Sequence, residues 1–240
     1  IGLENYKRLL TDTDVRTALL NSVKMMVLTV IFEVGIAFVL AVLVSQVKKL
    51  QHLFRTVYFF PVVISATAIG LLFKLFYNYN GGMLNQILEV FGVEPVNWLS
   101  PELAFIMVCI PTLWSYIGFY FVILLTGLSD IPDDIYEAAS IDGCNRFKQV
   151  FYITLPLMTP VLFMNLLIGL IGAFKSFTLF KILTDGGPNN ASLVYMLYLY
   201  KNAFSNFKLG YANAMSVFLF VIVGALTSLL YKTSKKWVYY

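Results

Sequence analysis

Five long apolar runs limit the folds that this chain can adopt. A helix needs about 20 apolar residues to cross a hydrocarbon core that is about 30 Å thick, and each run is long enough to do so. The sequence therefore predicts an all-α membrane protein, a polytopic helical bundle with five transmembrane helices. The predicted spans are residues 19–45, 54–77, 103–128, 155–183 and 210–231.

The composition agrees with a chain that lies mostly in lipid. Hydrophobic residues make up 59% of the sequence and charged residues 12%, whereas soluble domains average about 45–50% and about 25%. A soluble protein of this length would need more charge to cover its surface. The composition therefore excludes an ordinary soluble globular domain.

The sequence contains few features that point to catalysis. It has no Gly-x-x-x-x-Gly-Lys-Ser/Thr pattern, so no P-loop would bind and hydrolyse nucleotide. Cys109 lies in an apolar run and Cys144 in a polar segment, which argues against a disulfide between them. Two Cys with one His cannot complete a zinc site from protein ligands alone. We therefore expect no enzyme activity, catalytic residue, metal or cofactor in this chain, and a solvated surface role for His52.

Positive charges are concentrated in alternate loops between the runs. The positive-inside rule places loops rich in Lys and Arg in the cytoplasm, so residues 129–154 and the C-terminus are expected there. Residues 1–18, an amphipathic segment, are then extracellular, and because the chain begins at Ile1 we expect a further N-terminal span before it. Lys201 and Lys208 are exceptions to the pattern. The charges that support it are Lys48, Lys49, Arg55, Arg146, Lys148, Lys232, Lys235 and Lys236.

The segment from Asp130 to Pro160 separates the third and fourth runs and carries its own helix signals. Asp130 is a favourable N-cap and Pro132 suits a first helical turn. Gly143 is a natural stop, and Asn145 can cap a second short helix. We expect a helix-turn-helix that lies against a membrane surface. Its acidic residues at the positive end of the helix dipole are Asp133, Asp134 and Glu137.

The spacing within this segment resembles the EAA loop of ABC-importer permeases. It reads Glu137-Ala138-Ala139, three residues, Gly143, nine residues, then Ile153-x-Leu155-Pro156. In that family the loop is cytoplasmic and docks into a cleft of an ATPase subunit, which implies the same for residues 129–154. The alternative, an amphipathic surface helix with no partner, does not explain the fixed spacing. The implied ATPase-coupling residues are Glu137, Ala138, Ala139, Asp142, Gly143 and Pro156.

Further segments resemble the carbohydrate-uptake permeases of this family, those similar to MalF and UgpA. They are residues 2–6, 60–65, 73–78, 114–119, 174–177 and 183–190, so the resemblance covers nearly the whole chain. It implies a plasma-membrane subunit of a prokaryote that pairs with a second, homologous permease. It also implies two ATPase subunits that bind ATP and Mg, an extracellular sugar-binding protein and a sugar substrate. The expected surroundings are membrane lipid, with no nucleic acid partner.

Sugar recognition needs convergent hydrogen bonds to hydroxyls and aromatic rings that stack on pyranose faces. Suitable residues follow Pro61 and Pro111, where helices are loosened, and lie within the fourth run. In the family these segments line the translocation path. Ordinary helix packing is the alternative for each residue, and Lys175 would face an anionic sugar or pair with a neighbouring helix. The predicted substrate-path residues are Ser65, Thr67, Trp114, Ser115, Tyr116, Phe119, Lys175 and Ser176.

The sequence thus predicts the transmembrane permease subunit of an ATP-driven importer that carries a sugar or oligosaccharide. The alternative is an ion-coupled secondary transporter centred on Glu33 or Lys175. A charge at membrane depth normally faces the bundle interior, so Glu33 is expected to face protein or water rather than lipid. It would serve as a proton relay or as a buried, hydrogen-bonded helix contact.

Overall fold

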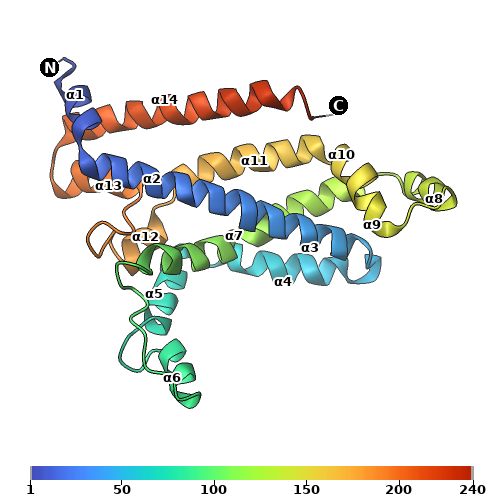
Figure 1. Cartoon of the computed structure of the whole chain (residues 1–240), viewed down its shortest axis with the longest axis horizontal. Coiled ribbons are helices and arrows are strands. Elements are labelled where there is room, and N and C mark those ends of the chain that lie inside the picture. The colour runs from blue at the N-terminus through green and yellow to red at the C-terminus, as the bar shows by residue number, and fades with distance from the viewer. Residues whose placement is uncertain (1, 239–240) are drawn as a thin grey trace. The chain divides into compact units, whose positions relative to one another are not determined.

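The computed structural model describes residues 2–238, and every regular element in that range is helical (Figure 1). In chain order the elements are α1 Glu4–Thr11, α2 Thr13–Leu28, η1 Thr29–Val34, α3 Gly35–Ser45, η2 Lys48–Leu50, α4 Gln51–Val63, α5 Ala66–Phe76, α6 Met83–Val90, α7 Ala104–Ser129, α8 Asp133–Ile141, α9 Arg146–Gln149, η3 Val150–Thr154, α10 Leu155–Leu157, α11 Thr159–Phe174, α12 Thr178–Leu183, α13 Tyr195–Tyr200, η4 Lys201–Ser205 and α14 Leu209–Ser234. The elements η1, η3 and η4 are π-helical turns, and η2 is a 3₁₀ turn.

Within the described residues, four helical stretches are long and apolar enough to cross a membrane. They are Thr13–Ser45, Ala104–Ser129, Thr159–Leu183 and Leu209–Ser234, and the bent pair Lys48–Val63 and Ala66–Phe76 makes a fifth if it counts as one span. The predicted all-helical membrane fold is therefore confirmed. The second run is broken because Ser65 has a non-helical backbone (ψ 129°) between α4 and α5.

The first and fourth runs depart from their predicted bounds. The first span starts before residue 19, because Oδ1 of Asp12 accepts a hydrogen bond from the N–H of Asp14 at 2.9 Å and caps α2. The fourth run is interrupted where α11 ends at Phe174 and α12 begins at Thr178.

The chain divides into two compact units. Unit 1 consists of residues 2–27, 64–113 and 171–224, and unit 2 of residues 28–63, 114–170 and 225–238.

Buried hydrogen bonds connect the elements of unit 1. The Ser22 hydroxyl accepts from the N–H of Tyr195 at 3.0 Å, and Nδ2 of Asn21 donates to the carbonyl of Leu193 at 3.0 Å. The hydroxyl of Tyr195 donates to the carbonyl of Met215 on α14 at 2.9 Å. These bonds satisfy polar groups that burial would otherwise leave without partners, so they fix α2, α13 and the start of α14 together.

Asp12, the residue that follows α1, connects the same three elements of unit 1, which are α2, α13 and α14. Its Oδ2 accepts hydrogen bonds from the hydroxyls of Tyr198 at 2.9 Å and Tyr211 at 2.6 Å. The Arg8 guanidinium lies 4.6 Å from the centre of the Tyr211 ring, and Figure 1 shows α1 beside the first turn of α14. Burial raises the pKa of the Asp12 carboxyl, but the bonds from Tyr211 and Tyr198 outweigh it and hold that pKa below its ordinary value of 3.8.

The apolar core of unit 2 forms where the first span meets α7. Gly118 of α7 lies so close to the carbonyl of Tyr58 on α4 that no Cβ would fit between them. Gly127 similarly approaches the side chains of Val161 and Met158. Such small residues let membrane helices pack closely. The buried core residues are Val34, Ala37, Ala41, Val44, Tyr120, Phe121, Leu124, Leu125, Leu128 and Met158.

Candidate functional site

The polar segment between α7 and α11 forms a helix-turn-helix in unit 2 (Figure 1). α8 ends at Ile141, and Gly143 has φ +77°, a conformation that favours glycine. Oδ1 of Asn145 then accepts from the N–H of Lys148 at 2.9 Å and caps α9. The predicted stop at Gly143 and cap at Asn145 are confirmed.

The start of α8 differs from the prediction. The N-cap position is Pro132, with ψ 137° and no side-chain cap bond, so the prediction of a cap at Asp130 and of Pro132 inside the helix is wrong. A residue that precedes proline is disfavoured in the helical region, and Ile131 therefore cannot belong to a helix that Asp130 caps. The N–H of Asp130 donates instead to the carbonyl of Gly127 at 3.3 Å and extends the end of α7.

Gln149 holds the two short helices together. Its side chain is buried, and Nε2 donates to the Ser140 hydroxyl at 2.9 Å and to the carbonyls of Tyr136 and Cys144, both at 3.2 Å. The Tyr136 hydroxyl is also 3.0 Å from the hydroxyl of Thr154, just before α10. These bonds therefore hold α8 and α9 together and attach them to the segment that leads into α11. Sequence reasoning missed Gln149, Tyr136 and Thr154, because these bonds depend on α8 folding back over α9.

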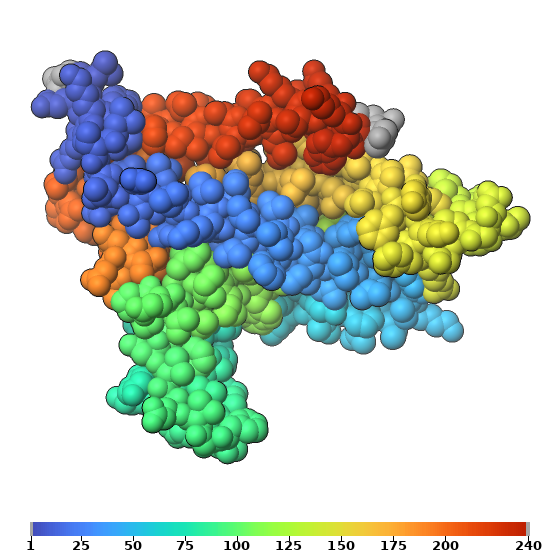
Figure 2. Space-filling view, viewed as in Figure 1, coloured from blue at the N-terminus to red at the C-terminus, as the bar shows by residue number. Residues whose placement is uncertain are grey.

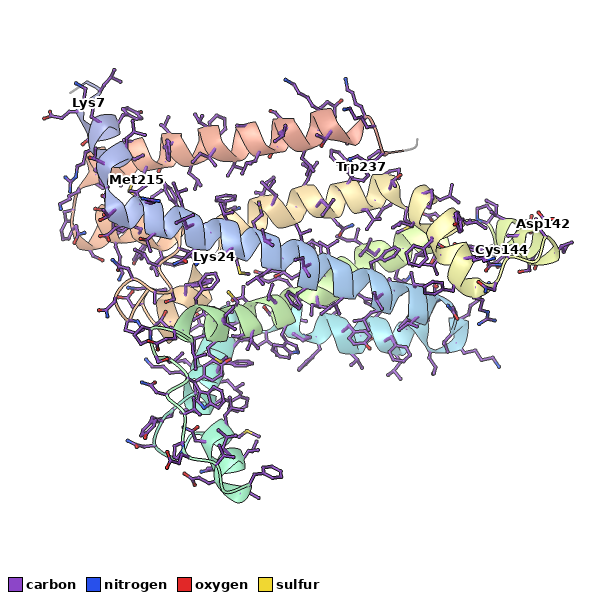
Figure 3. The ribbon with its side chains drawn as sticks, in the orientation of Figure 1. Lys7, Lys24, Asp142, Cys144, Met215 and Trp237 are labelled. Atoms are coloured by element: carbon purple, nitrogen blue, oxygen red, sulfur yellow. The ribbon has the colours of Figure 1, made fainter. Side chains whose placement is uncertain are left out.

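The predicted coupling residues lie on or beside the accessible side of this loop. In the space-filling view the segment 130–145 stands out from the adjoining segment 146–160 (Figure 2). Asp142 and Cys144 lie in the turn between the helices (Figure 3). Glu137, Ala138, Asp142 and Gly143 are exposed, and Ala139 and Pro156 are half-buried.

Apolar side chains accompany these residues on the loop surface. Ile141 is 87% exposed, Phe147 73% and Tyr152 76%. The rings of Phe147 and Phe151 pack with their centres 5.0 Å apart. Exposed apolar side chains rimmed by polar residues mark interaction surfaces, so the loop surface suits a protein partner that covers both acidic and apolar groups.

Two polar contacts attach the loop to the segment between α3 and α4. Lys48 forms an ion pair with Asp133, and Nη1 of Arg146 donates to Oε1 of Gln46 at 3.0 Å. A cavity of about 690 Å³ lies between these elements, with Tyr136 among its lining residues. The loop is therefore in contact with the segment that joins α3 to α4 as well as with the start of α11.

The predicted substrate-path residues divide between the two units. In unit 1, Ser65 and Thr67 are exposed at the start of α5, which packs on α12 through Gly70. Lys175 is exposed and Ser176 half-buried in the break between α11 and α12. The Ser176 hydroxyl lies 3.4 Å from the carbonyl of Gly172.

In unit 2 the predicted path residues lie on different faces of α7. Trp114 and Tyr116 are about half exposed, Ser115 is buried, and Phe119 packs edge-on against Tyr120 at 5.4 Å. Trp114 and Tyr116 thus have accessible rings, whereas Ser115 faces the packed interior.

Glu33 faces protein, as the sequence predicts. It lies on the π-helical turn η1, it is 3% exposed, and its side chain is hydrogen-bonded to that of Thr29. Within residues 2–238 the structure has no cluster of three or more His, Cys, Asp or Glu residues that could hold a metal ion.

Comparison with known proteins yields a family match and close relatives. Residues 33–238 match the family model described as binding-protein-dependent transport system inner membrane component. The chain is 37% identical to the probable ABC transporter permease protein YurN of Bacillus subtilis, with 98% of this chain and 84% of that protein covered. It is 33% identical to the trehalose/maltose transport system permease protein MalF of Thermococcus litoralis (98% and 80%). It is 36% identical to the arabinooligosaccharides transport system permease protein AraP of Halalkalibacterium halodurans (93% and 72%).

The fold also matches a solved structure. A crystal structure of a bacterial ABC transporter involved in the import of the acidic polysaccharide alginate contains a chain that superimposes with a TM-score of 0.90. The match covers 98% of this chain and 84% of that chain, at 23% sequence identity.

Proposed function

Because the chain belongs to the family of binding-protein-dependent transport system inner membrane components, we propose that it is the permease subunit of an ATP-driven importer for a sugar or oligosaccharide. The observation that carries the proposal is the loop spacing from Glu137 to Pro156 within the matched range. The relatives named for trehalose/maltose and arabinooligosaccharide transport support a sugar as the substrate.

The loop α8–α9 is the coupling element. Two ATPase subunits, which carry the ATP and Mg, hold α8 in a cleft and move it when they close. Glu137 is the charged anchor, and the small side chains of Ala138 and Ala139 let the helix approach closely. Because Gln149 and the pair Tyr136–Thr154 fix the loop as one body, the motion reaches α11, and the contacts of Lys48 and Arg146 carry it to α3 and α4.

Substrate passes along a path that this chain builds with a second, homologous permease. An extracellular binding protein delivers the sugar. The exposed rings of Trp114 and Tyr116 suit stacking on pyranose faces, and the hydroxyls of Ser65 and Ser176 suit hydrogen bonds to sugar hydroxyls. Lys175, exposed at the break before α12, would attract a substrate that carries a negative charge.

The subunit lies in the plasma membrane of a prokaryote with α8 and the C-terminus in the cytoplasm. Lys and Arg in the segment after α3, in α9 and at the end of α14 support this orientation through the positive-inside rule. The sequence has no Gly-x-x-x-x-Gly-Lys-Ser/Thr pattern, and we assign ATP hydrolysis to the partner subunits.

The test is a pull-down of the assembled complex from mild detergent. We expect an ATPase to copurify with the unmodified chain and to be lost from Glu137→Lys. Disrupting a hydrogen-bonded charge pair at an interface costs about 2–5 kcal/mol, which lowers recovery by more than about tenfold. Glu89→Lys, which reverses another exposed helical charge on α6, is the matched control and should keep the ATPase.

Equal recovery with Glu137→Lys and with the control would contradict docking through α8.

Uptake in vesicles distinguishes an ATP-driven importer from an ion-coupled transporter. Uptake that stops on ATP depletion supports the importer, whereas uptake that survives ATP depletion and collapses with a protonophore would favour ion coupling.

A further inference from the structure

Four buried polar side chains gather between the apolar helices of unit 2, away from the coupling loop. Thr29 and Glu33 belong to the first span, Tyr120 to α7 and Asn165 to α11. Glu33 is 3% exposed and Asn165 is fully buried. Ionisable residues in such positions are costly and are typically functional.

The packing of Gly169 fixes the register between the first span and α11. A Cβ on Gly169 would lie 3.1 Å from Cγ2 of Thr29 and 3.5 Å from the Tyr120 hydroxyl. The two helices run in opposite directions (Figure 1). The Glu33 side chain is hydrogen-bonded to that of Thr29, so both lie on this face of η1, and one turn back along α11 leads from Gly169 to Asn165, since residues four apart share a face of an α-helix. Glu33 and Asn165 are therefore neighbours.

Asn165 has an acceptor that lacks a donor. Its Nδ2 donates to the carbonyl of Val161 at 2.8 Å, but its Oδ1 is buried and has no hydrogen-bond partner. Buried amide oxygens are nearly always satisfied. An ionised Glu33 would offer two further acceptors, and only a protonated Glu33 can donate to this oxygen.

Among residues 2–238 no Lys, Arg or His forms an ion pair with Glu33. The group that faces it from α7 is the phenol of Tyr120, α11 contributes the neutral amide of Asn165, and on α4 Tyr58 packs on Phe121 instead. A buried carboxyl without a partner charge is normally neutralised rather than kept as an ion.

We propose that Glu33 is a proton-binding site within the membrane, and that its carboxyl O–H donates a hydrogen bond to Oδ1 of Asn165. The protonated carboxyl then connects η1 to α11 through this hydrogen bond. Loss of the proton leaves two hydrogen-bond acceptors facing each other, and they repel. Protonation of Glu33 is thereby linked to the pairing of these two helices. This inference rests on the local geometry and is independent of the sugar, the ATPase and the direction of transport.

Infrared difference spectroscopy of the full chain in lipid tests the proposal. At neutral pH, subtracting Glu33→Gln from the unmodified protein should leave the carbonyl stretch of a protonated carboxylic acid. Asn165→Ala removes the acceptor and should shift this band to higher wavenumber, and Asn165→Leu, which has a similar volume and no side-chain acceptor, serves if the alanine variant does not fold. Glu89→Gln is the matched control, because it makes the same substitution at an exposed glutamate on α6 and should leave this band unchanged.

Three results would overturn the proposal. The first is a difference spectrum with no protonated carboxyl at neutral pH. The second is a band that neither Asn165 variant shifts, which would exclude Asn165 as the acceptor. The third is a band that appears only when Na⁺ and K⁺ are replaced by a large organic cation, which would assign the site to a metal cation.

Discussion

At the scale of single residues, Asp12 shows how one carboxylate organises the entrance to the first span. It caps α2 through the N–H of Asp14 and accepts from two tyrosine hydroxyls on α13 and α14. Hydrogen bonds to a charged group are stronger than neutral ones. The carboxylate therefore contributes to the stability of unit 1 only while it is ionised.

Asp12→Asn should lower the stability of the folded protein by about 1 kcal/mol, because the side chain is partly exposed and the amide weakens both tyrosine bonds. The folded-state pKa of Asp12 is depressed below 3.8, so the stabilisation is fully present above that value and is lost as the pH falls through the folded pKa. Thermal unfolding in detergent measures this difference. Wild type and variant should differ at pH 7 and converge in strong acid, whereas a difference that persists there would contradict the argument.

The residue scale is also where prediction from the sequence was weakest. The prediction that Glu33 faces protein or water rather than lipid is confirmed. It could be made because a lone charge in an apolar run is costly in contact with lipid. Ser115 was grouped with Trp114 and Tyr116, but it is buried while they are exposed. Composition near a proline does not reveal which side of a helix is accessible, since that depends on the neighbouring helices.

At the scale of elements, the loop α8–α9 combines local signals with a tertiary contact. Gly143 adopts a backbone conformation that favours glycine, and Asn145 caps α9 with its side chain. Both roles are local, so the sequence could predict them. The start of α8 was missed because Pro132 acts on the residue before it. Gln149 could not be found from spacing, because its three acceptors belong to segments that meet only in the fold.

Gln149→Leu should loosen the coupling loop without unfolding the spans. Leucine removes the donor from three part-buried acceptors. A lost hydrogen bond costs about 1 kcal/mol, so the amides of α8 should exchange hydrogen about fivefold faster. Hydrogen exchange with mass spectrometry measures this rate. Gln86→Leu, which removes a single exposed bond to Gly81, is the matched control. Unchanged exchange in α8 would show that Gln149 does not fix the loop.

At the scale of the whole molecule, the proposed topology rests on the distribution of charge and on the apolar spans. Each of the four long helical stretches contributes residues to both units. The hydropathy of these stretches made the membrane fold predictable from sequence. The sequence predicts a loosened helix after Pro61, but it does not predict the break at Ser65, because the apolar run continues to residue 77.

The orientation can be tested with the two cysteines. Cys144 lies half-buried in the coupling loop, and Cys109 is 1% exposed in α7. A membrane-impermeant maleimide should label Cys144 in inverted vesicles and not in intact cells, with Cys109 unlabelled in both. Asn80→Cys combined with Cys144→Ser is the matched control, with its cysteine in the opposite set of loops. Labelling of Cys144 from outside the cell would reverse the assigned topology.

The π-helical turns determine where the chain can gain or lose a single residue in evolution. A π-helical turn such as η1 holds a surplus residue compared with regular α-helix. Loss of one residue there restores a regular turn and leaves the faces of the helix on either side in register, so Ala37, Ala41 and Val44 would still meet α7. The same loss inside α7 would rotate everything beyond it by about 100°. Single-residue insertions and deletions among homologues are therefore expected to accumulate at η1, η3 and η4.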